Sequence, residues 1–442
     1  MLPQAFFAAA SVSLVAHCLV NMRQIIKDRL PFYSLPKCGP QGRSLAAAEN
    51  PCGSWDAYIC SDSSGTFEPA GCSDFQTKTA SLIKSANMDP ETEQAAQLLE
   101  GKELEGGWRV LKKLSNSLHQ TGGIYSSYYE VENDGKKGFL KAFDYSAALK
   151  ATDDFTKEIN NITAAYNLER EILEICRDNG CKNVIEILDK GTVIVTEVKS
   201  YPRVEYLILE LAEKGDLRNV LHTDNVTLEW KIRSLHQLAK GLAELHKLSI
   251  AHQDIKPSNV VRISTLKTKI SDLGSAVTIN SNQNILPNRQ LLDLAGTREY
   301  APPELLYGAL NSDDTIRRIG CDLYLLGSMI AFYFTDTSMT ALIKLNLSDS
   351  LSWNLPQNYG RYESVKSYVI IAFEKALVDI GRKIKDDYLR EKLIEAVRFL
   401  CNPDPLERGH EKSIIQKGSN FSLERFITTF DLLARRIKLK QL

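Results

Sequence analysis

The stretch His252-Gln253-Asp254-Ile255-Lys256-Pro257-Ser258-Asn259 carries more information than any other part of the chain. A second short segment, Asp272-Leu273-Gly274, begins thirteen positions after the asparagine. Together they supply two carboxylates, two amides and an ammonium group. Asp, Asn and Gly are also common turn residues, so neither segment alone would indicate a site. Their order and spacing taken together favour one site built from two loops.

The two segments resemble the catalytic loop and the D-F-G loop of protein kinases, with Gln253 in place of arginine and Leu273 in place of phenylalanine. This resemblance implies transfer of the γ-phosphoryl group of ATP to serine or threonine hydroxyls of proteins. It implies that Asp254 is the base that positions the acceptor hydroxyl and that Lys256 contacts the transferring phosphate. Asn259 and Asp272 would then bind Mg²⁺, or Mn²⁺ in its place.

Other parts of the kinase pattern follow in chain order. Lys141 comes at the end of an apolar alternating run that predicts a strand, where the resemblance implies the lysine that holds the phosphates. Farther on, the apolar stripe Tyr166, Leu168, Ile172, Leu173 and Cys176 predicts a helix. Within it Glu169 is the implied partner of Lys141. Glu171 is the rival, and because the two lie on different helix faces only one can point inward.

The glycine-rich turn that kinases place over the ATP phosphates is poorly matched. Its counterpart is Thr121-Gly122-Gly123-Ile124-Tyr125-Ser126, in which only Gly123 occupies an expected glycine position. Thr121 and Ser126 replace the other two, and Gly122 adds flexibility beside them. The expectation is a stiffer cover whose hydroxyls and backbone N–H groups face the phosphates.

The segment Val204 to Ala212 predicts a strand that runs into a polar turn. It resembles the kinase hinge, which implies that backbone groups of Glu210 and Ala212 bind the adenine edge and that Leu209 lines the back of the pocket. By the same resemblance Asp216 reaches the ribose hydroxyls and Val261 forms part of the floor. These aliphatic residues are also ordinary core candidates.

Several architectural features support the same fold. An amphipathic helix is predicted from Lys231 to Leu248, leading to the catalytic loop. The segment Gly296 to Glu304 resembles the substrate-docking loop and A-P-E motif, with proline in place of its alanine. Glu304 needs a buried cationic partner, and Arg408 stands where the family would supply it. Asp322 matches the helix aspartate that braces the catalytic loop.

Gln253 is neutral, whereas kinases that are ordered by activation-loop phosphorylation carry arginine there. We therefore expect activity that does not require phosphorylation of this loop, even if hydroxyls in it are modified incidentally. Those hydroxyls belong to Ser275, Thr278, Ser281 and Thr297. The residues of these motifs resemble those of the bacterial subgroup of eukaryotic-like (Hanks-type) serine/threonine kinases.

The predicted fold class is therefore α+β with two lobes: a small antiparallel sheet plus helix, then a mainly helical lobe. The expected division is an apolar segment at 1–30, an N-terminal region and linker at 31–105, the first lobe at 106–212, the second at 213–435 and a basic tail at 436–442. An acidic stretch at 88–105 is expected to form a helix and linker. A formal net charge of −1 gives no reason to expect a nucleic-acid partner.

The N-terminal region is the least informative. The apolar run at 5–20 is shorter than the roughly 20 residues a spanning helix needs and lacks a basic start. It is either a packed helix or a membrane anchor, and insertion would leave the catalytic domain on the cytoplasmic side. Cys38, Cys52, Cys60 and Cys72 show no zinc spacing, and their pairing depends on the compartment. Buried thiols are expected at Cys176, Cys181, Cys321 and Cys401.

Two other classes of function fit parts of the sequence. A pseudokinase scaffold would explain the poor glycine loop and Gln253, but it has no chemical need for Lys141, Asp254 and Asp272 together. Phosphotransfer to a small molecule on a related fold would not need the docking segment at 297–304. Turnover of ATP would distinguish an active kinase from a pseudokinase scaffold. A comparison of peptide with metabolite acceptors would distinguish a protein kinase from a small-molecule phosphotransferase.

Overall fold

The computed structural model describes residues 94–114, 126–145, 155–198, 201–223, 226–279 and 296–439, and the backbone of three short strands before them. The chain divides into two compact units, Met1–Glu91 and Thr92–Leu442. In the first unit the strands β1 (Leu45–Glu49), β2 (Trp55–Cys60) and β3 (Phe67–Pro69) form one antiparallel sheet. The apolar run at 5–20 and the side chains of Cys38, Cys52, Cys60 and Cys72 lie outside the described residues.

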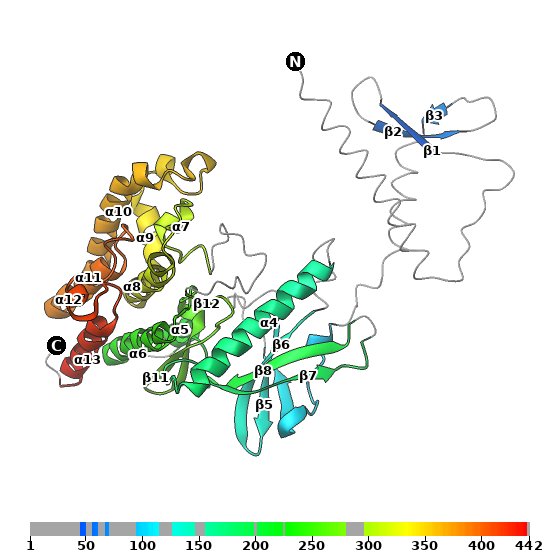
Figure 1. Cartoon of the computed structure of the whole chain (residues 1–442), viewed down its shortest axis with the longest axis horizontal. Helices are drawn as coiled ribbons and strands as arrows, with labels where there is room; N and C mark the ends of the chain where they lie inside the picture. Colours follow the sequence, from blue (N-terminus) through cyan, green and yellow to red (C-terminus); the bar gives the residue numbers. More distant parts are fainter. Residues whose placement is uncertain are drawn as a thin grey trace. The chain divides into compact units, whose positions relative to one another are not determined.

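The second unit begins with an antiparallel sheet of five strands in the order β4-β5-β6-β8-β7, drawn in cyan and green in Figure 1. Its strands are β4 (Arg109–Lys113), β5 (Ser126–Asn133), β6 (Lys136–Phe143), β7 (Ile187–Ile194) and β8 (Arg203–Glu210). Along β5 and β6 successive side chains alternate between the two faces. Tyr129, Val131 and Leu140 are buried on the face away from the second lobe, whereas Tyr128 and Lys141 occupy the other face.

One long helix, α4 (Phe155–Asp178), accompanies this sheet (Figure 1). The predicted apolar stripe is confirmed, because Tyr166, Leu168, Ile172, Leu173 and Cys176 are all buried in one cluster with residues of the sheet. The stripe fixes the rotation of the helix about its axis. That rotation decides which polar residues of α4 face the sheet and which face solvent.

The second lobe is mainly helical. Its helices are α5 (Leu217–Thr223), α6 (Leu228–Lys247), α7 (Pro303–Leu306), α8 (Gly320–Thr335), α9 (Met339–Asn346), α10 (Tyr362–Arg382), α11 (Asp387–Leu400), α12 (Lys412–Lys417) and α13 (Glu424–Lys438). The predicted amphipathic helix is α6. It begins three residues earlier than expected, because Thr227 accepts a hydrogen bond from the backbone N–H of Trp230 and caps it.

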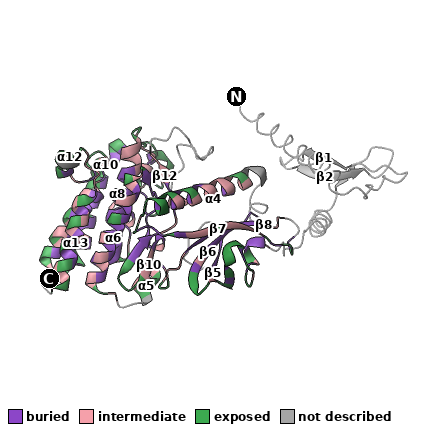
Figure 2. Cartoon of the chain, turned by 60° about the horizontal axis from the view of Figure 1, so that its bottom comes forward, coloured by how far each residue is buried: buried purple, intermediate pink, exposed green. Residues whose placement is uncertain are grey.

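Helix α8 is buried along nearly its whole length, as the purple ribbon in Figure 2 shows. It is apolar on all sides, which is typical of a helix surrounded by other elements. Asp322 is the acidic residue in its first turn and is fully buried. A buried carboxylate must have hydrogen-bond partners, so we expect Asp322 to accept hydrogen bonds from donors around it.

The acidic stretch differs from expectation. From Gln94 onward it forms two 3₁₀ turns, Ala95–Gln97 and Glu105–Gly107, rather than an α-helix. Ala96 and Leu99 are fully buried in the core of the five-stranded sheet, so this stretch packs onto the first lobe ahead of the expected start at residue 106. Among the residues that the structure describes, none of the helices has the length and apolar character needed to cross a membrane.

Candidate active site

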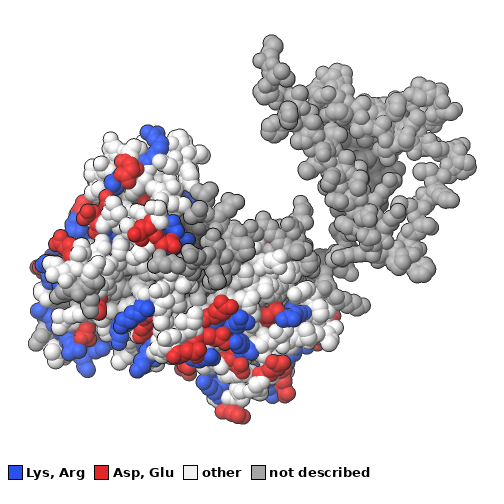
Figure 3. Space-filling model, in the orientation of Figure 1, with Lys and Arg blue, Asp and Glu red and all other residues white. Residues whose placement is uncertain are grey.

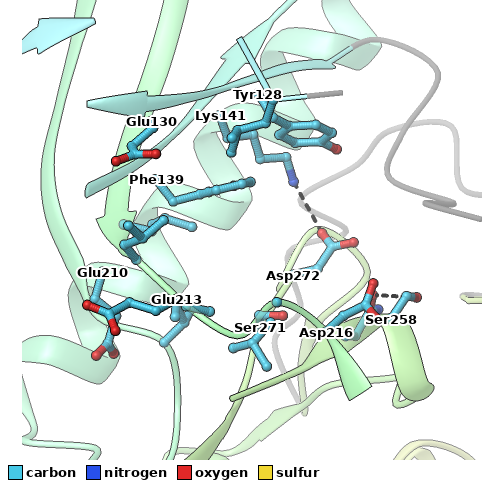
Figure 4. Close-up of a pocket in the computed structure, with 18 of the residues that line it drawn as sticks. Tyr128, Glu130, Phe139, Lys141, Glu210, Glu213, Asp216, Ser258, Ser271 and Asp272 are labelled. Atoms are coloured by element: carbon cyan, nitrogen blue, oxygen red, sulfur yellow. Dashed lines mark hydrogen bonds and ion pairs between the residues drawn. The ribbon is translucent and has the colours of Figure 1, made fainter. Parts of the chain in front are cut away.

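A cavity of about 460 Å³ lies between the sheet and the helical lobe. Its upper wall in Figure 4 is the lower face of the sheet, and its lower wall comes from the loops that follow β9 (Ile250–Ala251) and β11 (Lys267–Ile270). The strand β8 and the turn after it close one side. The site is therefore shared by two parts of the unit that are distant in sequence.

Lys141 is the central cation of this cavity. Its Nζ lies 2.8 Å from Glu169 Oε2 and 3.0 Å from Oε1, and it also reaches Asp272 Oδ1 at 3.2 Å. Glu169 is the inward-facing carboxylate of α4, with 2 % of its side chain exposed. Glu171, the rival candidate, has 52 % of its side chain exposed. The helix rotation therefore selects Glu169 as the partner.

Lys141 is stabilised by both carboxylates, whereas burial, with a further contribution from Asp272, raises the pKa of Glu169 despite its contact with Lys141. Burial alone would lower the pKa of Lys141, but the carboxylates of Asp272 and Glu169 outweigh burial and raise it. Burial would raise the pKa of Asp272, but the ammonium of Lys141 outweighs it and lowers the pKa below its usual value. Lys141 and Asp272 are therefore both charged near neutral pH. This state suits a site for an anionic ligand and a cation.

The catalytic-loop residues form a second group beside the cavity. Asp254 Oδ2 accepts a hydrogen bond from Asn259 Nδ2 at 3.0 Å and lies 2.8 Å from Lys256 Nζ. Asn259 Nδ2 also donates to the carbonyl of Asp254 at 2.8 Å. Both bonds use the amide nitrogen of Asn259, and its Oδ1, the atom that could bind a metal, accepts a hydrogen bond from the Ser258 hydroxyl at 3.3 Å. Asn259 lines the cavity, and its two bonds to Asp254 hold that residue beside it.

The segment that begins at Gly296 closes over this loop. The backbone N–H of Thr297 donates to Asp254 Oδ1 at 2.9 Å, and Lys256 Nζ donates to Thr297 Oγ1 at 2.7 Å. Gly296 has φ of 89°, and a Cβ there would lie 2.3 Å from the carbonyl oxygen of Gln253. Only glycine permits so close an approach with this backbone. Thr297 therefore fixes both the carboxylate and the ammonium group.

Buried side chains of α8 hold the catalytic loop from behind. Asp322 accepts backbone hydrogen bonds from His252 and Gln253, each at 2.8 Å. His246 Nε2 lies 2.9 Å from the same carboxylate, a contact that the sequence did not indicate. Gln253 itself has φ of 68°, a left-handed conformation that is unusual for a residue other than glycine. Its side chain donates to the carbonyl of Arg318 at 2.8 Å.

The predicted partner of Glu304 is present. Arg408 donates to both oxygens of this carboxylate, at 2.7 Å and 3.0 Å, and its side chain is fully buried. A bidentate pair of this kind is short and geometrically specific. It connects the end of the 296–304 segment to the loop before α12.

Most predicted ligand-binding positions come together. The cavity wall contains Lys141, Glu169, Leu209, Glu210, Ala212, Asp216, Asn259, Val261 and Asp272. Asp254 and Lys256 lie next to the wall rather than in it. Ser126 is not part of the wall. Thr121, Gly122, Gly123 and the modification candidate Ser281 lie outside the described residues.

The wall also contains residues that the sequence did not single out, chiefly Tyr128, Phe139, Ile185 and Ser271. Strand alternation could have found two of them. Phe139 is two positions before Lys141 on the same strand, and Tyr128 is the cross-strand neighbour of Lys141. Both side chains must therefore lie on the same face of the sheet as Lys141.

Of the four expected buried thiols, Cys181 is only partly buried.

The donor set fits a divalent cation bound together with phosphate. A carboxylate from Asp272 and an amide from Asn259 line the same cavity, and both offer oxygen, the ligand atom that Mg²⁺ prefers. Two protein ligands leave further positions for water and phosphate oxygens. Lys141, held by Glu169, supplies a separate positive charge for the phosphates.

Comparison with known proteins gives a family match. The model of the family described as "Protein kinase domain" matches residues 136–416. That range includes Lys141 near its start, Glu304, and Arg408 near its end. It covers more than half of the chain.

Similar individual proteins have kinase names. Over 206 residues the chain is 30 % identical to "Extracellular signal-regulated kinase 2" of Dictyostelium discoideum, covering 44 % of this chain and 53 % of that protein. It is 31 % identical to "Putative mitogen-activated protein kinase kinase kinase 7-like" of Drosophila melanogaster, over 40 % of each. It is 32 % identical to "Serine/threonine-protein kinase chk-1" of Caenorhabditis elegans, covering 37 % of this chain and 31 % of that protein. The chain thus spans about half, or less, of the length of these curated relatives.

Proposed function

Because this chain belongs to the protein kinase domain family, we propose that it transfers the γ-phosphoryl group of ATP to serine and threonine hydroxyls of protein substrates. The reaction requires a positioned acceptor, a neutralised phosphate chain and a bound divalent cation. Mg²⁺ is the cation we propose, with Mn²⁺ as a substitute. The names of the relatives support the serine/threonine class, and the oxygen ligands support the cation.

The observation that carries the proposal is the convergence of two charged groups on one cavity. Lys141, Glu169 and Asp272 form one group, with contacts of 2.8 to 3.2 Å. Asp254 and Lys256 form the other, beside the cavity, and Asp254 accepts a 3.0 Å hydrogen bond from Asn259, which lines the cavity. A binding scaffold that turned over no nucleotide would have no use for both.

In this mechanism Asp254 orients the acceptor hydroxyl and accepts its proton. Lys256, which lies 2.8 Å from Asp254, contacts the transferring phosphate as a point charge. Lys141 holds the phosphates in place while Glu169 fixes the direction of its side chain. Asn259 and Asp272 would hold the cation, which supplies neutralisation of phosphate charge when bound. The bonds from Thr297 keep Asp254 in position.

The direct test is transfer of radiolabel from ATP to the chain itself, to a generic basic protein and to a peptide library. Transfer to serine and threonine residues by the wild-type protein, with none by an Asp254→Ala variant purified in parallel, is the expected result. Absence of transfer to any protein or peptide, with ATP binding intact, would support the scaffold alternative. Transfer to metabolites alone would support a small-molecule phosphotransferase.

We further propose that activity does not depend on phosphorylation of the activation segment. Gln253 is neutral, and its side-chain amide bonds to the carbonyl of Arg318 and to Asp322, at 2.8 Å and 3.3 Å. These contacts support the catalytic loop without a phosphate group. Initial rates before and after phosphatase treatment should agree, and a collapse of the rate after treatment would disprove the idea.

Three finer assignments rest on the sequence. The bacterial subgroup is proposed from the residues of the segments 252–259, 300–308 and 321–329, and a non-bacterial source genome would rule it out. The division into 1–30, 31–105, 106–212, 213–435 and 436–442 is proposed from the sequence, with the difference that the end of the second segment packs onto the first lobe; limited proteolysis tests it. Membrane association through residues 5–20 is testable by fractionation, where full recovery of the intact chain without membranes would exclude it.

Proteins are the proposed partners, and we propose no nucleic-acid partner. On the face shown in Figure 3, lysine and arginine side chains are interspersed with aspartate and glutamate side chains on the described part of the chain. A nucleic-acid surface would instead show basic residues gathered on one face. Retention of the purified chain on DNA or RNA at physiological salt would contradict this view.

A further inference from the structure

Two aromatic rings lie in the wall of the cavity. Tyr128 of β5 and Phe139 of β6 are stacked, with ring centroids 5.4 Å apart and an angle of 26° between the ring planes. In the sheet Tyr128 pairs directly with Lys141, so Phe139 is its diagonal neighbour. Figure 4 shows both rings along the upper side of the pocket, with Tyr128 above Asp272 and Phe139 above Glu213.

The rings are held in place by the surrounding sheet and core. Tyr128 is buried, with 8 % of its surface exposed, and its ring covers one face of Phe139. Phe139 is partly buried and packs against the core cluster between the sheet and α4. About 460 Å³ of cavity remains beside them, a volume within the usual range for small-molecule sites. The rings therefore line the cavity and do not fill it.

Aliphatic side chains line the cavity near Phe139, on the same side as the charged residues Glu210 and Glu213 (Figure 4). Ile185 and Leu209 line it from the first lobe, and Val261 lines it from β10 (Val260–Ser264) of the second lobe. Ala212, just after β8, also lines the cavity there. Lys141 and Asp272 lie below the Tyr128 ring, on the side of the cavity away from Glu210 (Figure 4). The cavity thus has a charged pair near Tyr128 and a ring face with aliphatic side chains near Phe139.

We propose that Phe139, backed by Tyr128, is the surface on which the heterocyclic base of the bound nucleotide stacks, and that this stack sets the preference of the site for large bases. The inference rests on the proposed nucleotide-dependent function. Aromatic side chains bind bases through the π-face, and the contact is stronger for a larger ring system. The ring pair would provide affinity that the sparse glycine turn does not supply.

Binding measurements on the full chain test this directly. Calorimetric titration of ATP with Mg²⁺ gives the Kd for the wild type and for a Phe139→Leu variant. Loss of the stack should weaken ATP binding roughly five- to hundredfold. The ratio of CTP Kd to ATP Kd should also shrink, because leucine offers no ring face that favours purine. Tyr128→Leu should act in the same direction, since it removes the support of Phe139.

A matched control separates stacking from damage to the sheet. Tyr129→Leu replaces the next residue of β5, whose ring is fully buried on the opposite face and bonds to the carbonyl of Ala96 at 2.8 Å. This variant should lower the melting temperature and leave the Kd for ATP within about threefold of wild type, a difference of about 0.7 kcal/mol. If it does not fold, the CTP to ATP ratio of Phe139→Leu alone decides the question.

The outcomes are distinct. Equal or tighter ATP binding by Phe139→Leu would overturn the inference, because the ring would then occupy the space of the base. A weakened Kd with an unchanged CTP to ATP ratio would also overturn it, since a general loss of fit would explain the change. If wild-type protein binds no nucleotide, the proposed function fails as well. If wild type binds ATP and transfers phosphate while Phe139→Leu does both equally, only the stacking inference fails.

Discussion

Asp322 and Gln253 are separated by 69 residues, yet a carboxylate oxygen of Asp322 accepts the backbone N–H of Gln253 at 2.8 Å. The other oxygen accepts the backbone N–H of His252, also at 2.8 Å. The residue before the proposed base is thereby tied to a buried helix in the middle of the second lobe. Gln253 has φ of 68°, and these two bonds help to keep it in that conformation.

Replacement of Asp322 by Asn should disturb the catalytic loop. An amide has one acceptor oxygen, so at least one of the two backbone N–H groups would face a donor and lose its partner. An unsatisfied buried donor costs about 1–3 kcal/mol. We expect a lower free energy of unfolding together with a lower kcat, measured by denaturant titration and by a peptide assay. Wild-type values of both would show that the brace is dispensable.

Glu169 and Glu171 provide a matched pair of variants. Glu169→Gln removes a carboxylate that lies 2.8 Å from Lys141, so the lysine should lose its orientation and kcat/KM for ATP should fall. A fall of at least about tenfold is expected, equal to about 1.4 kcal/mol. Glu171→Gln changes an exposed side chain and should leave kcat/KM unchanged. Equal effects of the two substitutions would contradict the assigned pairing.

Asp254 and Asp272 should differ in their effects on binding and turnover. Asp254→Asn should lower kcat by about 10²–10⁴ because the acceptor hydroxyl loses its base. Its Kd for ATP should stay close to wild type, since Asp254 does not line the cavity. Asp272→Asn should weaken the binding of ATP with Mg²⁺, because a proposed cation ligand is lost. Calorimetry and initial rates measure both quantities, and reversed effects would require the roles to be reassigned.

The Glu304–Arg408 pair should contribute strongly to the integrity of the fold. Arg408→Leu leaves the buried carboxylate of Glu304 unpaired, and breaking a buried pair costs about 3–5 kcal/mol. Arg398→Ala is the control, because Arg398 and its partner Glu374 are about half exposed and such pairs contribute about 0–1 kcal/mol. Urea titration gives both values. A loss below about 1 kcal/mol for Arg408→Leu would show that Glu304 finds other partners.

His236 should make stability depend on pH. Burial lowers its pKa, Lys240, Arg233 and Arg435 lower it further, and Asp431 opposes them. In the unfolded chain the value returns to about 6.5, so the unfolded state binds the proton first as pH falls. The free energy of unfolding should therefore decrease as pH drops below about 6.5 and stop decreasing below the folded-state pKa.

A His236→Gln variant isolates that effect. As the pH falls from about 7.5 to about 5.5, the free energy of unfolding should decrease more for wild type than for the variant. Other titrating groups are common to both proteins and cancel in the difference. A difference that stays constant with pH would mean that the pKa of His236 is the same in the folded and unfolded chains.

Local sequence was sufficient for much of the fold. Side-chain alternation predicted the strand that carries Lys141, and three- and four-residue steps predicted α4 and α6. The resemblance to kinases implied that Glu304 and Arg408 would meet, and they do. Helix ends were less well predicted, since α6 follows the Thr227 cap and begins at Leu228 rather than Lys231. The acidic stretch forms 3₁₀ turns rather than a helix, and its residues Ala96 and Leu99 are buried.

What the sequence determined by itself was the set of chemical groups and their order: the carboxylates, the amide, the lysines and the apolar periods. Those properties are local, because residue type and spacing depend only on the chain. Tertiary structure decided which groups meet. The rotation of α4 chose Glu169 over Glu171, folding brought Asp272 to Lys141 across 131 residues, and sheet register placed Phe139 beside Tyr128. Such contacts depend on packing between distant elements, and no local pattern specifies them.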